Sequence, residues 1–279
     1  MLKNASKNQR IIYINPSNRR IFFSLHAKVK ELDKRIRVGA VSYLNTKPLL
    51  FGVRNDAALL ERIDLIEDYP ARIAEMLLKD EIDVGLIPVA VLPKMKESYI
   101  LTDYCIGAEA EVASVCIFSE QPIKNITHVL LDYQSCTSVN LAKVLLKHYW
   151  KKKVIFIDGG IDFRTQIKGH TAGVVIGDRA LEQRNISPFV YDLAGTWKKM
   201  TGLPFIFAAW IANKSLDANF IAAFNQANGY GVRHLVEVLA NIHYPIYDLH
   251  KYYTENISYL LTDEKRKGLE QFLSLLNNV

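Results

Sequence analysis

The feature that most constrains the fold is the alternation of short apolar runs with segments of helical spacing. Buried strands are expected at residues 36–41, 83–88, 128–132, 154–157 and 172–177. Pro48 and Pro70 each open a helical segment, and residues 137–150 repeat apolar side chains at the period of an amphipathic helix. Strands and helices that alternate in this way predict an α/β protein with largely parallel pairing in its central mixed sheets.

Two further apolar strands, residues 112–119 and 204–212, are longer and bracket a central block with its own βαβ pattern. This arrangement predicts two lobes joined by two crossover strands that form a hinge. We expect lobe 1 to comprise residues 36–118 and 206–279, lobe 2 to comprise residues 119–205, and residues 1–35 to form a separate extension. Ligands of such proteins bind beyond the carboxyl ends of the strands, which here means between the lobes.

Positive charge is concentrated in the N-terminal extension. The whole chain has a formal net charge of +6, whereas residues 1–37 alone carry +8 and leave −2 for the remainder. Because the body of the protein is not basic, a nucleic-acid partner is not expected. The extension is interpreted as a disordered arm or a mis-assigned start, and we expect it to be dispensable.

The sequence lacks the patterns typical of secretion, membrane insertion or metal binding. The apolar run of the extension at residues 21–23 is too short for a signal peptide, and no apolar stretch is long enough to span a bilayer. The three cysteines show no CxxC spacing, and the seven histidines form no HxxxH or HxH pair. We therefore expect a cytoplasmic protein with reduced thiols, no metal and no membrane partner, and the oligomeric state stays open.

Polar residues gather at loops that follow strands. The first loop, Ser42-Tyr43-Leu44-Asn45, follows the strand at 36–41. The other candidate positions are Ser114, Ser135, Thr137, Ser138, Gly177, Asp178 and the turn Thr201-Gly202-Leu203-Pro204. Each also has a simpler interpretation, such as a turn asparagine, a structural serine, or an N-cap at Asp178 for a helix that begins at Arg179.

The hydroxyl groups at the start of the helix at 137–150 favour an anion site. One hydroxyl is enough to cap a helix, whereas Ser135, Thr137 and Ser138 supply three within four residues. Free N–H groups and the positive end of the helix dipole attract carboxylates or phosphates. No histidine lies near Cys136 in the sequence, which disfavours a nucleophilic thiol, and no nucleotide-binding glycine loop is present. The pattern predicts a small carboxylate-bearing ligand held by neutral donors, without a cofactor.

Five segments resemble the chorismate dehydratase family, in the family's order and over about residues 36–276. They are VGAVSYLNTKPLL, DVGLIPVA, SCTSVNLAKVLL, VVIGDRAL and YDLAGTWKKMTGLPFIFAAW. The resemblance implies the fold of type II periplasmic binding proteins and a lyase of menaquinone biosynthesis by the futalosine pathway. It implies catalytic roles for Asn45 and Ser114. It implies substrate-carboxylate binding by Ser135, Thr137 and Ser138. From their loops at strand ends, Ser42, Tyr43, Gly177 and Asp178 are also expected to bind the substrate.

The implied reaction removes the C3 proton and the C4 hydroxyl of chorismate and gives 3-[(1-carboxyvinyl)oxy]benzoate. An amide and an alcohol do not titrate near neutrality, so neither Asn45 nor Ser114 is a good general base. We expect the enolpyruvyl carboxylate of the substrate to take the proton, while the protein holds the reactive conformer and hydrogen-bonds the departing hydroxyl.

Other functions stay open on the sequence alone. The sister enzyme dihydroxynaphthoate synthase shares the fold but has a first loop of the Asn-Asp-Thr-Phe type, whereas this chain has Tyr-Leu-Asn-Thr. A non-catalytic solute-binding protein for a small carboxylate is the main alternative, and it would be expected to carry a secretory signal. An effector domain of a transcription regulator is the third, and it would need a helix-turn-helix.

Overall fold

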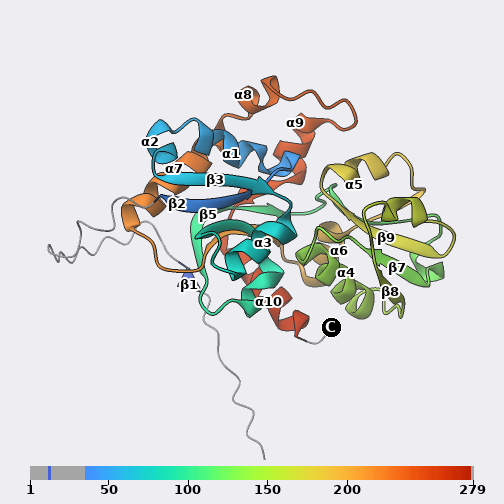
Figure 1. Cartoon of the computed structure of the whole chain (residues 1–279). Coiled ribbons are helices and arrows are strands. Elements are labelled where there is room, and N and C mark those ends of the chain that lie inside the picture. The colour runs from blue at the N-terminus through green and yellow to red at the C-terminus, as the bar shows by residue number, and fades with distance from the viewer. Residues whose placement is uncertain (1–11, 14–34, 278–279) are drawn as a thin grey trace, which may run out of the picture.

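Two β-sheets organise the part of the chain that the computed structural model describes, residues 12–13 and 35–277. The first sheet has the order β1 (Ile12–Tyr13), β5 (Tyr99–Ala108), β11 (Phe205–Ala212), β4 (Val84–Pro88), β2 (Ile36–Val41) and β3 (Ile63–Asp68), and β12 (Ser258–Leu260) also pairs with β5. The second has the order β10 (Phe189–Asp192), β6 (Val115–Ser119), β9 (Thr171–Ile176), β7 (His128–Leu131) and β8 (Ile155–Asp158). Figure 1 shows the two sheets side by side in separate lobes.

Helices cover both sheets. Around the first sheet lie α1 (Lys47–Arg54), α2 (Ala57–Leu60), α3 (Pro70–Leu78), α7 (Ala218–Arg233), α8 (Leu235–Ala240), α9 (Leu249–Lys251) and α10 (Asp263–Leu276). Around the second lie α4 (Thr137–His148), α5 (Asp178–Gln183) and α6 (Leu193–Thr201). Short 3-10 helices span Leu44–Thr46, Val89–Lys94, Ile123–Asn125 and Phe163–Gln166, and a π-helix spans Tyr252–Asn256. None of the described helices is both long and apolar enough to cross a bilayer.

The predicted α/β architecture is confirmed, and both sheets are mixed. In the first, β2 runs parallel to β3 and β4, whereas β11 is antiparallel to both β4 and β5. In the second, β7 is parallel to β8 and β9, whereas β6 is antiparallel to β9 and β10. These antiparallel pairs involve β6 and β11, the strands that follow the two crossings between the lobes, and β12 is also antiparallel to β5.

The segment that leads from the first lobe to the second begins its strand later than predicted. The expected strand at 112–119 begins only at Val115, because Ala113 has a positive φ of 63° that no extended strand adopts. This strand, β6, pairs within the second sheet, so a lobe boundary after residue 118 would separate it from its partners β9 and β10. Strand pairing instead places the crossing at residues 109–114. The hinge between the two lobes stays a prediction.

The N-terminal extension enters the first sheet at one point. Ile12 and Tyr13 form β1, which pairs in parallel with Tyr99 and Ile100 of β5. For these two residues the expectation of a disordered arm is wrong, because their backbone extends the sheet edge. The remainder of the predicted extension, residues 1–11 and 14–34, lies outside the described residues.

A close helix crossing positions the first loop. Helix α1 begins directly after the 3-10 turn Leu44–Thr46, with Pro48 in its first turn. Where α1 crosses α7, a Cβ on Gly52 would lie 1.7 Å from the carbonyl oxygen of Ala227, and one on Gly231 would lie 1.8 Å from that of Pro48. Only glycine fits at both positions, so the two helices pack backbone to backbone and fix the start of α1.

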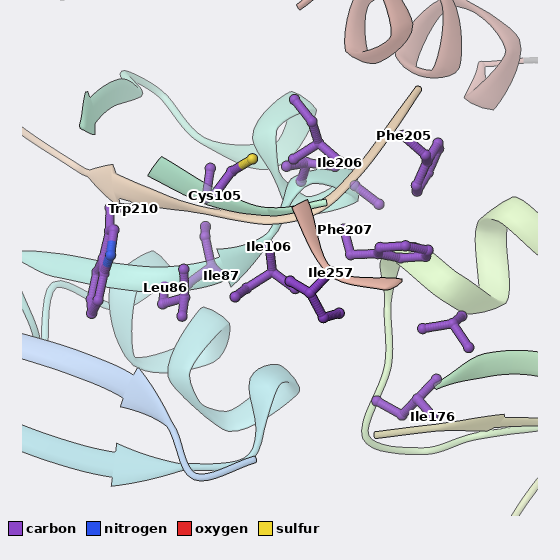
Figure 2. Close-up of a cluster of buried hydrophobic side chains, with 14 of the residues drawn as sticks. Leu86, Ile87, Cys105, Ile106, Ile176, Phe205, Ile206, Phe207, Trp210 and Ile257 are labelled. Carbon is purple, nitrogen blue, oxygen red and sulfur yellow. The ribbon is translucent and has the colours of Figure 1, made fainter. Parts of the chain in front are cut away.

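The hydrophobic core of the first lobe continues to the boundary with the second. Figure 2 shows Leu86, Ile106 and Phe207 from the first sheet on one side of this boundary, and Ile176 from β9 on the other. All four are buried. These apolar side chains also form walls of the cavity described next.

Candidate active site

A cavity lies between the two lobes, a position at which small-ligand sites are common. Its apolar walls are Val41, Pro70, Leu86, Pro88, Ile106, Val112, Val115, Ile176, Phe207 and Ala208. Its polar and glycine positions are Tyr43, Asn45, Thr46, Ser135, Thr137, Ser138 and Gly177. The cavity therefore combines a surface suited to a carbon ring with neutral hydrogen-bonding groups, and the residues that line it include no carboxylate, imidazole or amine.

The first loop contributes Asn45 to the cavity, as predicted from the strand-to-helix turn. Two buried tyrosines hold its backbone: the Tyr253 hydroxyl donates to the carbonyl of Leu44 (3.0 Å) and the Tyr259 hydroxyl to that of Asn45 (2.9 Å). The Asn45 side-chain oxygen accepts a hydrogen bond from the Thr46 hydroxyl at 3.1 Å. The amide group is thus oriented toward the cavity by contacts from residues more than 200 positions away in the sequence.

The start of α4 forms the opposite polar side. Ser135 caps this helix, because its Oγ accepts the N–H of Ser138 at 3.2 Å. Thr137 Oγ1 accepts the N–H of Ala90 from the first lobe at 3.1 Å, which leaves its own proton available to a ligand. The Ser138 hydroxyl makes no hydrogen bond within residues 12–13 and 35–277. The Ser135 hydroxyl therefore binds the helix backbone, whereas the hydroxyls of Thr137 and Ser138 can donate to an anion.

The α4 start also contains Cys136, for which the sequence disfavoured a nucleophilic role. Burial raises the pKa of its thiol, so it is protonated at neutral pH. Its sulfur is within 3.7 Å of the Asn140 amide nitrogen, an ordinary side-chain contact. The geometry gives this cysteine no base that would activate it.

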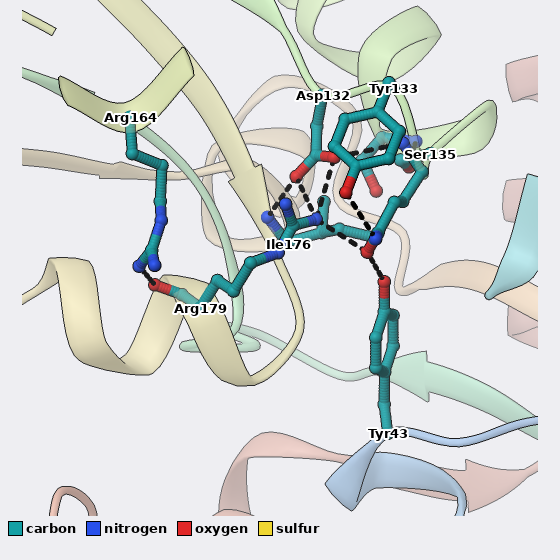
Figure 3. A network of polar contacts seen from close by, with 9 residues as sticks. Tyr43, Asp132, Tyr133, Ser135, Arg164, Ile176 and Arg179 are labelled. Carbon is teal, nitrogen blue, oxygen red and sulfur yellow. Dashed lines mark hydrogen bonds and ion pairs between the residues drawn. The ribbon is translucent and has the colours of Figure 1, made fainter. Parts of the chain in front are cut away.

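A polar network joins the two lobes beside the cavity (Figure 3). The Tyr43 hydroxyl of the first loop donates to the side-chain oxygen of Gln134. Arg179 Nη2 donates to the same Gln134 oxygen at 2.8 Å and to both carboxylate oxygens of Asp132 at 2.9 Å. Burial raises the pKa of Tyr43, which keeps its hydroxyl protonated as a donor. Gln134 and Arg179 were missed as site residues, although Arg179 lies in the segment VVIGDRAL, because nothing in the sequence links either residue to Tyr43.

Asp178 makes a second contact between the lobes. It was predicted to cap a helix that begins at Arg179, and this prediction is wrong: α5 begins at Asp178 itself, and Gly177 occupies the N-cap position. Its Oδ1 instead accepts the N–H of Leu44 at 3.1 Å. Burial raises the pKa of this carboxyl from 3.8 to about 6. Asp178 does not line the cavity, so its contact is with the first loop and not with the space for a ligand.

Gly177 lines the cavity and is required by its conformation. Its φ is +62°, and a Cβ at this position would lie 3.1 Å from the ring of Tyr43. A side chain would therefore strain the backbone and push on Tyr43 at once. The predicted binding role fits a backbone that approaches the cavity closely.

Ser114 lies beside the cavity but does not face it. It precedes β6, is fully buried, and its Oγ accepts a hydrogen bond from the buried Tyr252 hydroxyl at 2.7 Å. The neighbouring residues Val112 and Val115 do line the cavity. The expectation of a serine within a strand is wrong, because the positive φ of Ala113 turns the chain just before it.

Two further predicted positions lie outside the cavity. Ser42 is exposed and does not line it. The turn at 201–204 is the end of α6, where the Thr201 hydroxyl bonds to the carbonyl of Trp197 and Gly202 ends the helix in the left-handed conformation. Across residues 12–13 and 35–277 no cluster of His, Cys, Asp and Glu has the arrangement of a metal site.

The comparisons with known proteins agree with this geometry. A curated chorismate dehydratase from Thermus thermophilus is 27% identical over 271 residues, which cover 86% of this chain and 94% of that protein. The solved structure of protein AF1704 from Archaeoglobus fulgidus matches with a TM-score of 0.65 at 12% identity, over 88% of this chain and 97% of that one. The periplasmic aliphatic sulphonate binding protein SsuA from Escherichia coli matches with a TM-score of 0.52 at 15% identity, over 88% and 92%.

The structural likeness confirms the predicted periplasmic-binding-protein-like fold. The sequence model of a protein family described as "Menaquinone biosynthesis" matches residues 36–278, which begin at β2 and exclude the N-terminal extension. With a match over most of its length, this chain belongs to the menaquinone biosynthesis family.

Proposed function

We propose that this chain is a chorismate dehydratase, which eliminates water from chorismate to give 3-[(1-carboxyvinyl)oxy]benzoate in menaquinone biosynthesis by the futalosine pathway. The observation that carries the proposal is family membership over residues 36–278 together with a likeness, over most of both chains, to a protein named for this activity. The cavity between the lobes supports it, because its mixture of apolar and neutral polar groups suits a small cyclic acid.

The start of α4 is the proposed site for a substrate carboxylate. Thr137 and Ser138 supply hydroxyl donors there, and the first-turn N–H groups add the partial positive charge of a helix N-terminus. Apolar walls from both lobes then enclose the ring. Tyr43 and Gly177, on the two sides of the gap between the lobes, limit the space around it.

The reaction breaks the C3–H and C4–O bonds of chorismate. The proton leaves C3, the C3–H electron pair forms the new ring double bond, and the C4 hydroxyl departs and is released as water. Since the ring becomes aromatic, the overall step is strongly downhill, and the barrier lies in proton removal and in departure of the hydroxyl. Neither oxidant nor reductant is needed, which fits the expectation of an enzyme without a cofactor.

Asn45 and Ser114 are the proposed catalytic residues. Asn45 faces the cavity and can hydrogen-bond the departing hydroxyl or hold the reactive conformer. The Ser114 hydroxyl accepts from the Tyr252 hydroxyl at 2.7 Å and donates to the carbonyl of Val112 at 3.5 Å, a distance at which a hydrogen bond is weak. Rotation about the Ser114 Cα–Cβ bond would direct this donor to the substrate. The cavity lining supports the enolpyruvyl carboxylate of chorismate as the base, since no lining side chain is a carboxylate, imidazole or amine.

Chorismate is accordingly the proposed small-molecule partner, and the cytoplasm the proposed compartment. The described cysteines Cys105, Cys116 and Cys136 are all free thiols, as is usual in a reducing environment.

The proposal is tested by incubating the purified full chain with chorismate and following its ultraviolet spectrum, with the product identified by proton NMR. The expected result is loss of the cyclohexadiene absorption and appearance of 3-[(1-carboxyvinyl)oxy]benzoate, unchanged by EDTA. Chorismate alone and the Asn45→Ala variant are the controls. Chorismate that decays no faster than in buffer, although calorimetry shows that it binds, would favour a solute-binding protein instead.

A further inference from the structure

The crossing from the first lobe to the second contains a strained turn immediately before Ser114. The Ser114 N–H donates to the carbonyl of Val112 at 2.7 Å, and the residue between them, Ala113, has a φ of +63°. A bond from residue i to i+2 around a positive central φ defines the rare and strained form of γ-turn. A non-glycine residue in this conformation persists only where its surroundings hold it, and such positions cluster at functional sites.

Asp192 binds the backbone of this turn, although it lies 80 positions after Val112 and 79 positions after Ala113. Its Oδ2 accepts the N–H of Ala113 at 2.8 Å, and its Oδ1 accepts the N–H of Val112 at 3.2 Å. Oδ1 also accepts the N–H of Gly195 at 2.9 Å, which caps α6. The aspartate is 8% exposed, so these bonds lie in a nearly dry environment where an unmet donor is costly.

Arg184 holds the other side of the same turn. Its Nη1 donates to the carbonyl of Ala113 at 3.0 Å and lies 3.4 Å from the sulfur of Cys116. Both polar groups of the Ala113 backbone are therefore bound by charged side chains of the second lobe. The crossing is tied to that lobe at the residue that precedes Ser114.

Helix capping alone does not account for these contacts. Asp217 caps α7 by accepting the N–H groups of Asn219 and Phe220, both in its own helix. Asp56 caps α2 by accepting the N–H of Leu59 in the same way. Asp192 differs because one of its oxygens, Oδ2, bonds to the crossing and not to its helix.

We propose that Asp192, assisted by Arg184, is a positioning residue for the dehydration: it holds the strained turn at Ala113 and thereby places Ser114 for the reaction. This inference rests on the proposed catalytic role of Ser114. Ser114 is further held by its carbonyl, which accepts the N–H of Gly177 at 2.8 Å, so the turn sets the Oγ position against a fixed point on the cavity wall. Loss of the clamp should affect kcat more than KM, because the α4 start that binds the carboxylate is untouched.

Asp192→Asn is the sharpest variant, because an amide oxygen in the Oδ1 position still caps α6 whereas the amide nitrogen cannot accept the N–H of Ala113. We expect kcat to fall about tenfold to a hundredfold. The KM should stay within about threefold of the KM of the unsubstituted protein. Asp217→Asn is the matched control, because Asp217 caps α7 and its cap bonds stay within that helix. Its kcat should stay within about twofold of that of the unsubstituted protein.

Ala113→Gly separates positioning from a general loss of packing. Glycine adopts a positive φ without strain, so the turn no longer needs the clamp. Added to Asp192→Asn, it should recover at least fivefold of the lost kcat. A merely structural role for Asp192 would not be rescued by a residue that removes a Cβ from the crossing.

The proposal is overturned if Asp192→Asn keeps kcat within twofold, or if Ala113→Gly restores none of a lost kcat. Should Asp192→Asn fail to fold, Arg184→Met takes its place, with a smaller expected loss of kcat and the same rescue. Failure of the proposed function is distinguishable: Ser114→Ala with an unchanged kcat, or a full chain that leaves chorismate intact, removes the catalytic role itself. A double-mutant cycle in urea unfolding then still reports whether Asp192 holds the turn, through the coupling between Asp192→Asn and Ala113→Gly.

Discussion

The two polar sides of the cavity are built in different ways. At the start of α4, the cap is local, since Ser135 Oγ binds the N–H of Ser138 three residues later. On the first loop, the backbone around Asn45 is held by Tyr253, Tyr259 and Asp178, which lie 134–214 positions away. The α4 start therefore forms wherever this helix forms, whereas the first loop takes its shape only in the complete fold. We expect binding to depend on the former and turnover on the latter.

The largest expected effect is the loss of kcat in Asn45→Ala. Donors that act on a developing charge in the transition state are worth about 10²–10³ in kcat for comparable groups. The variant should fold normally, because among the described residues the Asn45 side-chain oxygen accepts a hydrogen bond only from the Thr46 hydroxyl. Steady-state kinetics checks this, and a kcat near that of the unchanged chain would remove Asn45 from the chemistry.

Ser138→Ala should act on the other side of the comparison. A hydrogen bond to a charged group is worth about 1.5–3 kcal/mol, so KM should rise about tenfold to a hundredfold with a smaller change in kcat. Ser42→Ala is the matched control: this serine is exposed and outside the cavity, and its variant should behave as the unchanged chain. Equal effects of the two serines would show that the α4 start is not the carboxylate site.

Asp178 connects the second lobe to the first loop, and the titration of its carboxyl gives a pH test. Because the folded protein raises the pKa of this carboxyl to about 6, it binds the proton more tightly than the unfolded chain does. Its contribution to stability is therefore full below about pH 4 and is lost as pH rises through 6. Asp178→Asn keeps an acceptor for the Leu44 N–H without the buried charge, so it should stabilise the protein by about 2–3 kcal/mol at pH 8 and little at pH 4.

Thermal unfolding of both proteins at the two pH values measures this difference. A variant that melts lower than the unchanged chain at pH 8 would show that the charge, and not only the acceptor, holds the first loop. If kcat follows a pKa near 6, the same variant decides its origin. A profile that becomes flat while activity remains assigns the titration to Asp178 and not to a base that acts on chorismate.

Tyr259→Phe is expected to have a smaller effect on the first loop. The change removes one neutral hydrogen bond to the carbonyl of Asn45, worth about 1 kcal/mol, and keeps the buried ring. We expect a loss of kcat of about fivefold. Tyr99→Phe, which removes an exposed bond to Glu97, is the control. If the two variants lose the same activity, the long-range support of Asn45 is not important for turnover.

Removal of residues 1–33 should have the smallest effect. Family similarity begins at residue 36, and the described part of the extension adds only Ile12 and Tyr13 to the edge of β5. A chain that starts at Lys34 should keep its activity, with a melting temperature within a few degrees of the full chain. Loss of most activity would place a functional residue in the extension.

The same contrast explains what the sequence could predict. The start of α4 at Thr137 was predicted correctly, because helix periodicity depends on neighbours a few positions apart. The position of Asn45 at a strand end was also predictable, but its support by Tyr253 and Tyr259 was not, since nothing local links them. The network of Gln134 and Arg179 was missed for the same reason.

Strand predictions failed where polar residues or backbone strain interrupt the pattern. β5 was missed because Thr102 and Asp103 break its apolar run, although Thr102 bonds to the backbone of Tyr104 and Asp103 to Asn225. The strand before Ser114 was extended too far because the sequence Val-Ala-Ser does not reveal a positive φ. Asp192 and Arg184, which bind the backbone of that turn, are distant from it in sequence.

Calorimetric titration with 3-[(1-carboxyvinyl)oxy]benzoate tests most directly whether one side of the cavity binds and the other promotes the reaction. The ligand is the proposed product, so no turnover disturbs the measurement. For Asn45→Ala we predict a Kd within about threefold of that of the unchanged chain, and for Ser138→Ala a Kd about tenfold to a hundredfold weaker. Binding that is lost in Asn45→Ala and retained in Ser138→Ala would contradict this division of the site.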